Sequence, residues 1–265
     1  MFFKQKQLSE QDIKQIPRSF DIIGSILVFS AFPKELKKKE KLIGAYLISK
    51  FKNIKTVAKK TKVYSGKYRT PKLKIIAGEK NLETIHIENG IKLKLNPEKT
   101  YFSPRTGSER LRIAKEVKKG EDVLVMFSGV SPFPLTISKH SKANEIYAVE
   151  INPLAHRYAE ENLKLNKINN IQLFQGDVKK VLPEIKKKFN RIIMPLPKSS
   201  EDYLDLALKH LKPKGTVYMY LFEKEDNFKK LKEKYSKKFK VKLIKAGSPS
   251  PGVFRVCVEL QSKIQ

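Results

Sequence analysis

Residues 122–133, which read DVLVMFSGVSPF, decide the fold class of this 265-residue chain. The run 122–127 has no polar interruption after its aspartate, which is typical of a strand that is covered on both faces of a parallel sheet. The small residues around Gly129 predict a turn into a helix that ends near His140. A turn of this kind lets a nucleotide approach the backbone, although a single glycine does not make a dinucleotide fingerprint.

Strands and helices alternate from this stretch to the end of the chain. Further strands are expected at residues 145–150, 171–174, 191–196, 216–222, 241–245 and 253–260. Asn152 is expected to cap one helix, with Pro153 at its first position, and Ser199 to cap another over residues 200–211. The alternation predicts an α/β fold with a parallel, doubly wound, Rossmann-like sheet, and such sheets bind ligands at the carboxyl ends of their strands.

The residues before Asn96 follow a different pattern. Extended segments are expected at residues 20–30, 56–58, 73–77, 84–88 and 91–95, and a helix at residues 34–52. Asn89 and Gly90 predict a hairpin turn between the last two extended segments. We therefore expect a smaller N-terminal α/β domain over residues 1–95 and the sheet domain over residues 96–265.

The charge of the chain favours a polyanionic partner. Lysine and arginine together number 56 against 27 acidic residues, which gives a net charge of +29. Residues 1–95 carry 22 basic and 8 acidic side chains and are the more densely basic part. A lysine-rich proteome explains scattered surface lysines but explains this excess less well. Neutralisation of phosphates and release of counterions favour nucleic acid, and we expect residues 1–95 to contribute to its recognition.

Cysteine content and hydropathy restrict the setting. The one cysteine, Cys257, cannot form a disulfide framework or a thiolate metal site, and the four histidines are scattered, so no metal is expected. No apolar run approaches the roughly 20 residues that cross a bilayer, so no membrane association is expected. The sequence indicates a cytoplasmic protein and implies no protein partner.

Two expected strand ends carry residues that suit a nucleotide. Phe127, Ser128 and Gly129 form the turn after the first strand, and Glu150, followed by Ile151, ends the second. This spacing lets the Glu150 carboxylate accept a pair of ribose hydroxyls. A glutamate at a strand end can also be an ordinary surface residue, but the turn beside it favours the functional interpretation.

Other candidates are ambiguous from local sequence alone. Asp177, followed by Val178, can accept from the exocyclic amine of an adenine, cap a helix, or do both. Pro195 indicates only that the fourth strand ends. By spacing, Glu109 is an acid that complements a helix dipole, and Arg69 is a surface arginine.

Taken together, the motifs resemble a known family, the archaeal and eukaryotic tRNA (guanine-N1)-methyltransferases that modify guanosine 37, next to the anticodon. The resemblance covers roughly residue 64 to the C-terminus. It is carried by Tyr101-Phe102-Ser103-Pro104-Arg105, Glu109-Arg110, Met126-Phe127-Ser128-Gly129-Val130 with Pro132-Phe133, Glu150-Ile151-Asn152-Pro153 with Glu161-Asn162 and Leu165-Asn166, and Pro251-Gly252-Val253-Phe254.

The resemblance implies a class I S-adenosylmethionine methyltransferase sheet, with S-adenosylmethionine as cofactor and the anticodon arm of tRNA as partner. It implies that Glu109 removes the proton from guanine N1 and that Arg69 stabilises the charge that develops on O6. Methylation at N1 requires a base and a cation of this kind. The cofactor-binding residues that it implies are Tyr101, Arg110, Phe127, Ser128, Gly129, Glu150, Ile151, Asp177, Val178 and Pro195.

Three features depart from the family pattern. Val125 replaces an acid on the first strand, which changes the recognition expected at the methionine end of the cofactor. Pro195-Leu196-Pro197 replaces Asn-Leu-Pro and resembles the archaeal branch that also methylates C7 of 4-demethylwyosine, giving isowyosine. The chain is shorter than members with an additional N-terminal domain, so recognition is expected to depend more on the anticodon arm.

Two alternatives stay open at this point. A wybutosine-pathway aminocarboxypropyl transferase would share much of the fold and the cofactor but move a different group to the same tRNA position. A non-catalytic RNA-binding protein would retain the fold without activity. The presence of Glu109, Glu150 and Asp177 argues against the second alternative, whereas Val125 and Pro195 keep it open.

Overall fold

The computed structural model describes residues 8–263, and the chain divides into two compact units. The first comprises Met1–Ile87 and Lys92–Pro104, and the second comprises Glu88–Ile91 and Arg105–Gln265. The sequence places the division after Leu95, whereas the structure places it after Pro104 and assigns the hairpin tip Glu88–Ile91 to the second unit.

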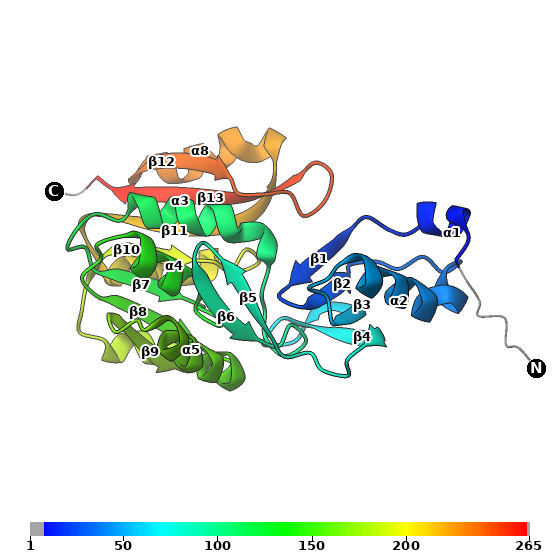
Figure 1. Cartoon of the computed structure of the whole chain (residues 1–265). Coiled ribbons are helices and arrows are strands. Elements are labelled where there is room, and N and C mark those ends of the chain that lie inside the picture. The colour runs from blue at the N-terminus through cyan, green and yellow to red at the C-terminus, as the bar shows by residue number, and fades with distance from the viewer. Residues whose placement is uncertain (1–7, 264–265) are drawn as a thin grey trace, which may run out of the picture. The chain divides into compact units, whose positions relative to one another are not determined.

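The first unit is built on a four-stranded sheet in the order β1-β2-β3-β4. Its elements are α1 (Glu10–Lys14), β1 (Phe20–Ile23), β2 (Ile26–Phe29), the 3-10 turn η1 (Lys37–Lys39), α2 (Glu40–Lys50), β3 (Thr56–Ser65) and β4 (Thr70–Gly78). Helix α2 connects β2 to β3, which are parallel, and packs against β3 and β4 (Figure 1). A parallel pair needs such a crossover because a short turn cannot reverse the chain twice.

The N-terminal predictions were correct in part. The single strand expected over residues 20–30 is wrong, because Gly24, at φ +55°, turns the chain so that β1 and β2 pair antiparallel. A β-carbon at Gly24 would lie 2.2 Å from the Thr84 hydroxyl oxygen, so only glycine is accommodated there. The hairpin predicted at Asn89 and Gly90 is confirmed, with β5 (Thr84–Glu88) and β6 (Ile91–Leu95) as its strands.

The second unit is a Rossmann-like α/β domain with a seven-stranded sheet in the order β12-β13-β11-β10-β7-β8-β9. Strands β7 to β11 are parallel to their neighbours among themselves, and β13 is antiparallel to both β11 and β12. The parallel sheet that the sequence predicts is therefore mixed at one edge. The strands are β7 (Val123–Met126), β8 (Ile146–Glu150), β9 (Ile171–Gln175), β10 (Phe189–Met194), β11 (Leu211–Lys224), β12 (Phe239–Lys245) and β13 (Val253–Ser262).

Helices cover both faces of this sheet. They are α3 (Gly107–Glu116), α4 (Pro132–His140), α5 (Pro153–Asn166), α6 (Val178–Val181), α7 (Leu204–Lys209) and α8 (Phe228–Ser236), with 3-10 turns η2 (Pro104–Thr106), η3 (Leu182–Glu184), η4 (Glu201–Tyr203) and η5 (Glu225–Asn227). None of the helices within residues 8–263 combines the length and the hydrophobicity that a membrane crossing requires.

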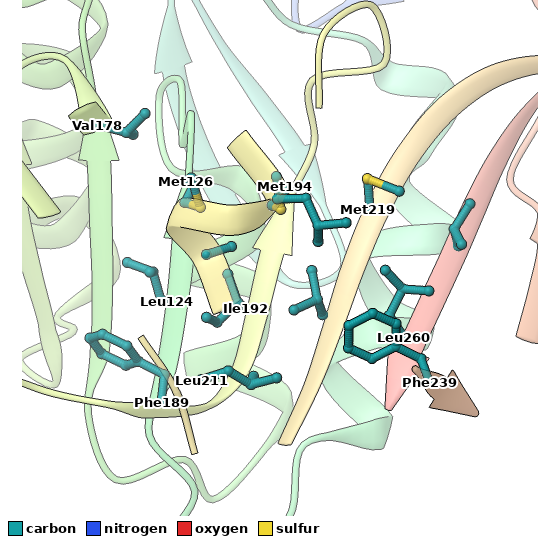
Figure 2. Close-up of a cluster of buried hydrophobic side chains, with 14 of the residues drawn as sticks. Leu124, Met126, Val178, Phe189, Ile192, Met194, Leu211, Met219, Phe239 and Leu260 are labelled. Atoms are coloured by element: carbon teal, nitrogen blue, oxygen red, sulfur yellow. The ribbon is translucent and has the colours of Figure 1, made fainter. Parts of the chain in front are cut away.

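The sheet's alternation of side chains separates an apolar face from a face that carries polar groups. Leu124, Met126, Ile192 and Met219 belong to a fully apolar core cluster (Figure 2). The alternate residues of the same strands point the other way, toward α3 and α4. On that face Tyr220, which is buried, reaches Glu109 of α3.

The helix expected over residues 200–211 is shorter than predicted. The cap predicted at Ser199 is wrong, because Ser200 stands at the N-cap of η4 and Tyr203 at that of α7, neither with a side-chain cap hydrogen bond. The Ser200 hydroxyl donates to the backbone oxygens of Met194 and Leu196 instead. Helix α7 begins only at Leu204. The cap predicted at Asn152 is confirmed, since its side chain accepts from the amides of Leu154 and Ala155.

Candidate active site

A strained loop follows β7 at residues 127–131. Phe127, Gly129 and Ser131 have φ values of +59°, +58° and +65°, all in the left-handed region. For residues other than glycine this conformation costs on the order of 1–3 kcal/mol each, and it persists only where the surroundings enforce it. Such strain concentrates at ligand sites.

Three hydrogen bonds enforce the shape of the 127–131 loop. The Ser128 amide donates to the backbone oxygen of Val149 over 2.9 Å. The Gly129 amide donates to Glu150 Oε2 over 2.7 Å. The side-chain amide of Asn162, buried on α5, donates to the backbone oxygen of Val130 over 3.1 Å. Strand β8 and helix α5 thus hold the loop at the carboxyl end of β7.

Glu150 is a buried carboxylate that accepts hydrogen bonds from backbone amides. Oε2 accepts from Gly129 and Oε1 accepts from Asn152 over 2.7 Å. Burial raises the pKa of the Glu150 carboxyl, and the amides of Asn152, Gly129 and Ile151 oppose that rise. Each carboxylate oxygen can accept two hydrogen bonds, so a carboxylate that accepts from three amides still has acceptor capacity for a ligand hydroxyl.

The neighbouring strand ends bring the remaining predicted residues of the second unit to the same edge of the sheet. Ile151 follows β8 directly, Asp177 and Val178 follow β9, and Pro195 follows β10. Strands β9, β8, β7 and β10 are adjacent in the sheet, so their carboxyl ends line one edge. Asp177 caps α6, because its Oδ1 accepts from the Lys179 amide over 2.9 Å.

The loop carries two buried hydroxyl groups. Within the described residues, Ser128 Oγ and Ser131 Oγ are buried side-chain atoms for which the structure gives no hydrogen-bond partner. A buried polar group without a partner is costly, and it often marks a place where a ligand or an ion binds. Both hydroxyls belong to the strained segment beside Glu150.

Glu109 lies buried in the first turn of α3, on the polar-bearing face of the sheet. Its Oε1 accepts from the Tyr220 hydroxyl and from Arg112 Nη2, each over 2.7 Å. Its Oε2 accepts from Arg112 Nε over 2.8 Å. The Tyr220 ring lies 6.0 Å from that of Phe133 on α4, the helix that the 127–131 loop leads into. Glu109 is therefore more than a helix-dipole acid.

The predicted cofactor residue Arg110 has a structural contact in the second unit. Its guanidinium forms a bidentate ion pair with Glu88 over 2.5 Å and donates to Thr106 Oγ1 over 2.5 Å. Both side chains of the ion pair are almost completely buried. Arg110 thus fixes the hairpin tip beside α3.

Tyr101 and Arg69 belong to the first unit. Tyr101 is half-buried in the segment after β6. Arg69 is half-buried in the turn between β3 and β4, at φ +50°, and its amide donates to the backbone oxygen of Gly66 over 3.1 Å. Glu109 and Arg69, the two predicted catalytic residues, therefore lie in different units of the chain.

Sequence reasoning missed the residues that hold the predicted ones in place. Asn162 was noted only as part of a motif, yet it anchors the 127–131 loop. Arg112 and Tyr220 carry no motif, although both contact Glu109. Their roles depend on tertiary contacts, because a tyrosine within a strand reveals nothing of the residue that it will contact.

Two family models match the chain. The TRM5/TYW2 methyltransferase domain matches residues 84–244, and the TYW2 N-terminal domain matches residues 4–81. The chain belongs to the TRM5/TYW2 methyltransferase family. The first match covers the strained loop, Glu109, Glu150 and Asp177, so the sequence-based resemblance is confirmed.

Curated relatives of this TRM5/TYW2 chain carry several names. The tRNA (guanine(37)-N(1))-methyltransferase Trm5b of Pyrococcus abyssi is 45% identical over 79% of this chain and 62% of its own length. The tRNA (guanine(37)-N(1))/4-demethylwyosine(37)-methyltransferase Taw22 of Nanoarchaeum equitans is 32% identical over 78% of this chain and 85% of its own. A tRNA(Phe) (4-demethylwyosine(37)-C(7)) aminocarboxypropyltransferase of Pyrococcus horikoshii is 28% identical over 97% of this chain and 93% of its own length.

A solved structure agrees with this grouping. The complex of aTrm5 with tRNALeu has a TM-score of 0.82 and 33% identity, over 96% of this chain and 74% of that protein. The chain thus spans less than two thirds of the Pyrococcus abyssi relative but about three quarters of the protein solved with tRNA.

Proposed function

We propose that this TRM5/TYW2 chain is an S-adenosylmethionine-dependent methyltransferase that methylates N1 of guanosine 37 in tRNA. The observation that carries the proposal is a buried carboxylate, Glu109, on a helix that packs over the sheet whose strand ends hold the 127–131 loop and Glu150. The names of the relatives with 45% and 32% identity support the same reaction.

The residues at the strand ends suit S-adenosylmethionine. Glu150 would accept both ribose hydroxyls, and Asp177, with Val178 behind it, would accept from the adenine amine. Ser128 and Ser131 offer buried hydroxyls without a partner among the described residues, and the bend at Gly129 gives a ligand access to backbone. The remaining lining would come from Phe127, Ile151 and Pro195, with Tyr101 and Arg110 shaping the site.

The chemistry needs a base and a cation from the protein. The bound sulfonium supplies the methyl group. Glu109 would accept the N1 proton of guanine as the new N1–carbon bond forms and the sulfur–carbon bond breaks. Arg69 would stabilise the negative charge that develops on O6 as that proton leaves.

The excess positive charge supports tRNA as the partner. The net charge is +29, and the 22 basic side chains of residues 1–95 make that part of the chain the more densely basic one. We assign residues 1–95 a role in RNA recognition, with the anticodon arm as the element contacted. Phosphate neutralisation makes such binding strongly dependent on salt. A tRNA substrate and a lone buried thiol, Cys257, agree with a reducing cytoplasm.

Mass spectrometry of nucleosides tests the proposal. A tRNA transcript with guanosine at position 37 is incubated with the protein and S-adenosylmethionine, then digested. We expect a gain of one methyl group on a nucleoside that chromatographs as 1-methylguanosine. A transcript with adenosine at position 37 is the matched control and should gain nothing. Methylation of both transcripts, or of neither, contradicts the assignment to N1 of guanosine 37.

Mass spectrometry of nucleosides also distinguishes N1 methylation of guanosine from a second substrate and from a second reaction. The relative named for 4-demethylwyosine methylation and the Pro195-Leu196-Pro197 strand end support methylation at C7 of that precursor. The aminocarboxypropyltransferase that covers 97% of this chain supports transfer of the larger group instead. Mass separates the two products on a pre-modified tRNA. Binding of tRNA without any product would favour an RNA-binding protein.

A further inference from the structure

Nine lysines gather at one edge of the seven-stranded sheet, in residues 228–245, which form α8 and β12 (Figure 1). This basic segment contains a single acidic side chain, Glu233, so nine positive charges against one negative charge leave a net charge of +8 over 18 residues. Helix α5 of the same unit carries two basic and two acidic side chains. Positive charge in the second unit is therefore concentrated in the basic segment.

The lysines of the basic segment lie on the surface, and all nine are exposed. Three of them, Lys234, Lys242 and Lys245, form ion pairs with carboxylates. Among residues 8–263 the structure gives no ion pair for the other six, which are Lys229, Lys230, Lys232, Lys237, Lys238 and Lys240. Clustered charges of one sign without counter-charges create a potential that attracts a polyanion.

Protection of the sheet edge explains only part of this charge. Strand β12 is outermost in the sheet, and lysines on such a strand discourage pairing with another chain. Lys240 and Lys242, on the strand itself, are sufficient for that purpose. Six of the nine lysines precede β12, however, on α8 or directly after it. On the helix, Lys230 and Lys234 are four residues apart, a spacing at which like charges destabilise a helix.

The basic segment is fixed to the fold, so its lysines form a preformed surface. Leu231 and Tyr235 of α8 are buried in the apolar core cluster. At the other end of the segment, the ammonium group of Lys245 lies 5.8 Å from the ring centroid of Phe228 and 4.3 Å from that of Phe254. These contacts join the start of α8 to the end of β12 and the start of β13. A preformed surface loses little conformational entropy when it binds.

The basic segment also lies close to the proposed base. Lys242 Nζ on β12 is 3.8 Å from Glu259 Oε2 on β13. Arg112 Nη1 donates to Glu259 Oε1 over 2.6 Å, and Arg112 Nη2 donates to Glu109 over 2.7 Å. Two side chains, Glu259 and Arg112, therefore separate Lys242 from Glu109 within the second unit.

We propose that the basic segment binds the phosphate backbone of the RNA substrate, as a second recognition surface in addition to residues 1–95. The proposal rests on the proposed function for the identity of the RNA. A base that reaches Glu109 brings the phosphates of its flanking nucleotides toward this side of the unit. Lysine suits such contacts because it is a point charge on a flexible stem, and phosphate contacts fix position without selecting sequence.

Binding of the guanosine-37 tRNA transcript at several salt concentrations tests the proposal. In Lys229→Gln/Lys230→Gln/Lys232→Gln, each phosphate contact that is lost lowers the slope of log affinity against log salt by nearly one, so the slope should fall by about two to three. Affinity at about 0.1 M salt should fall at least about tenfold. In methyl transfer the loss should appear in KM for tRNA, with kcat and S-adenosylhomocysteine affinity at the wild-type values.

The matched control removes the same charge elsewhere in the second unit. Lys164→Gln/Lys186→Gln/Lys188→Gln replaces exposed lysines of α5 and of the segment before β10, and it should keep the wild-type slope. A second variant of the basic segment, Lys237→Gln/Lys238→Gln/Lys240→Gln, should lower the slope in the same direction. It also tests the surface if thermal unfolding shows that the first variant fails to fold.

A lower slope in the variants of the basic segment, with the control at the wild-type slope, supports the proposal. A wild-type slope in folded variants of the basic segment would mean that its lysines only solvate the surface. An equal loss in the control would mean that net charge alone acts, and either result overturns the proposal, as does a wild-type chain that does not bind the transcript. If the wild-type chain binds the transcript but transfers no methyl group, the proposed function fails, and the binding comparison still decides the role of the basic segment.

Discussion

Two buried carboxylates of the second unit, Glu150 in β8 and Glu109 in α3, are held in opposite ways. Glu150 accepts hydrogen bonds from the backbone amides of Gly129 and Asn152. Glu109 accepts from a charged guanidinium, Arg112, and from the Tyr220 hydroxyl. Amides are weak compensation for a buried charge, and the pKa of the Glu150 carboxyl is accordingly raised by burial.

The difference shows how one fold gives two acids different tasks. A carboxylate whose hydrogen-bond donors are backbone amides keeps acceptor capacity for a ligand. It forms charge-assisted hydrogen bonds when the ligand's hydroxyls bind. A carboxylate held by a guanidinium and a hydroxyl is fixed in direction, as a base must be before it accepts a proton. We therefore expect Glu150 to serve binding and Glu109 to serve the chemical step.

Glu109→Gln should have the largest effect. The amide keeps the shape of the side chain but cannot accept the N1 proton, and loss of a general base lowers a rate about a hundredfold to ten-thousandfold. S-adenosylhomocysteine affinity, measured by calorimetry, should change little. Glu160→Gln, on the exposed face of α5, is the control for loss of one carboxylate. Equal losses of rate and affinity would instead make Glu109 part of the cofactor site.

Glu150→Ala should act on binding. It removes the acceptor for two ribose hydroxyls, and a hydrogen bond to a charged group contributes about 1.5–3 kcal/mol, so affinity should fall by at least about tenfold. It also leaves the buried amides of Gly129 and Asn152 without their acceptor, which costs about 1–3 kcal/mol of stability each. Calorimetry and thermal unfolding measure the two effects. Glu145→Ala, at the other end of β8, is the control, and unchanged affinity in Glu150→Ala would remove the ribose assignment.

Local patterns were sufficient to predict the binding edge of the sheet. The apolar run before Gly129, the Asn152 cap and the ends of β8 and β9 are all features of short segments, and the structure confirms them. Gly129 and Glu150, which are 21 residues apart in the sequence, are also in direct contact. Each of these features depends on residues that are close in the chain, so sequence periodicity reports them.

The environment of Glu109 could not be predicted in the same way. Tyr220 lies 111 residues further along the chain, and Arg112 joins Glu259 across 147 residues. Such pairs form only because β11 and β13 lie beside each other in the sheet, and the antiparallel position of β13 was itself not expected. The same limit explains the wrong strand over residues 20–30, where the sequence signal was an apolar run and the turn at Gly24 interrupts it.

The pH dependence of cofactor affinity separates the two carboxylates further. The pKa of free Glu150 lies above its ordinary value, and ribose hydroxyls favour the ionised carboxylate as acceptor. Affinity should therefore be constant above that raised pKa and weaken by up to about tenfold per pH unit below it. The contribution of Glu150 to folding has the opposite sign, because a raised pKa in the folded state means stability that is lost as pH rises through it.

Calorimetry of S-adenosylhomocysteine binding at several pH values checks this behaviour. Glu109→Gln is an informative control, since it removes a buried carboxyl outside the strand ends and should leave the affinity profile intact. Glu150→Gln should flatten the profile. A profile that follows Glu109 rather than Glu150 would reverse the division of tasks between the two acids.

Asn162→Ala should have the smallest effect, and it tests whether Glu150 depends on the shape of the 127–131 loop. The side chain of Asn162 is fully buried and donates to the backbone oxygen of Val130, so its removal costs about 1–3 kcal/mol and loosens the loop. Because Gly129 belongs to that loop, cofactor affinity should fall a few-fold, while the rate of methyl transfer at saturating cofactor, which reports Glu109, stays the same.

Asn166→Ala is the matched control for that variant. Asn166 lies one turn later on α5 and donates to the backbone oxygen of Asn162, so it should leave affinity unchanged. A loss of methyl-transfer rate at saturating cofactor in Asn162→Ala would mean that the loop and Glu109 are coupled, through Phe133 and Tyr220, whose rings lie 6.0 Å apart. The two carboxylates would then act as one site whose binding and chemical steps cannot be altered separately.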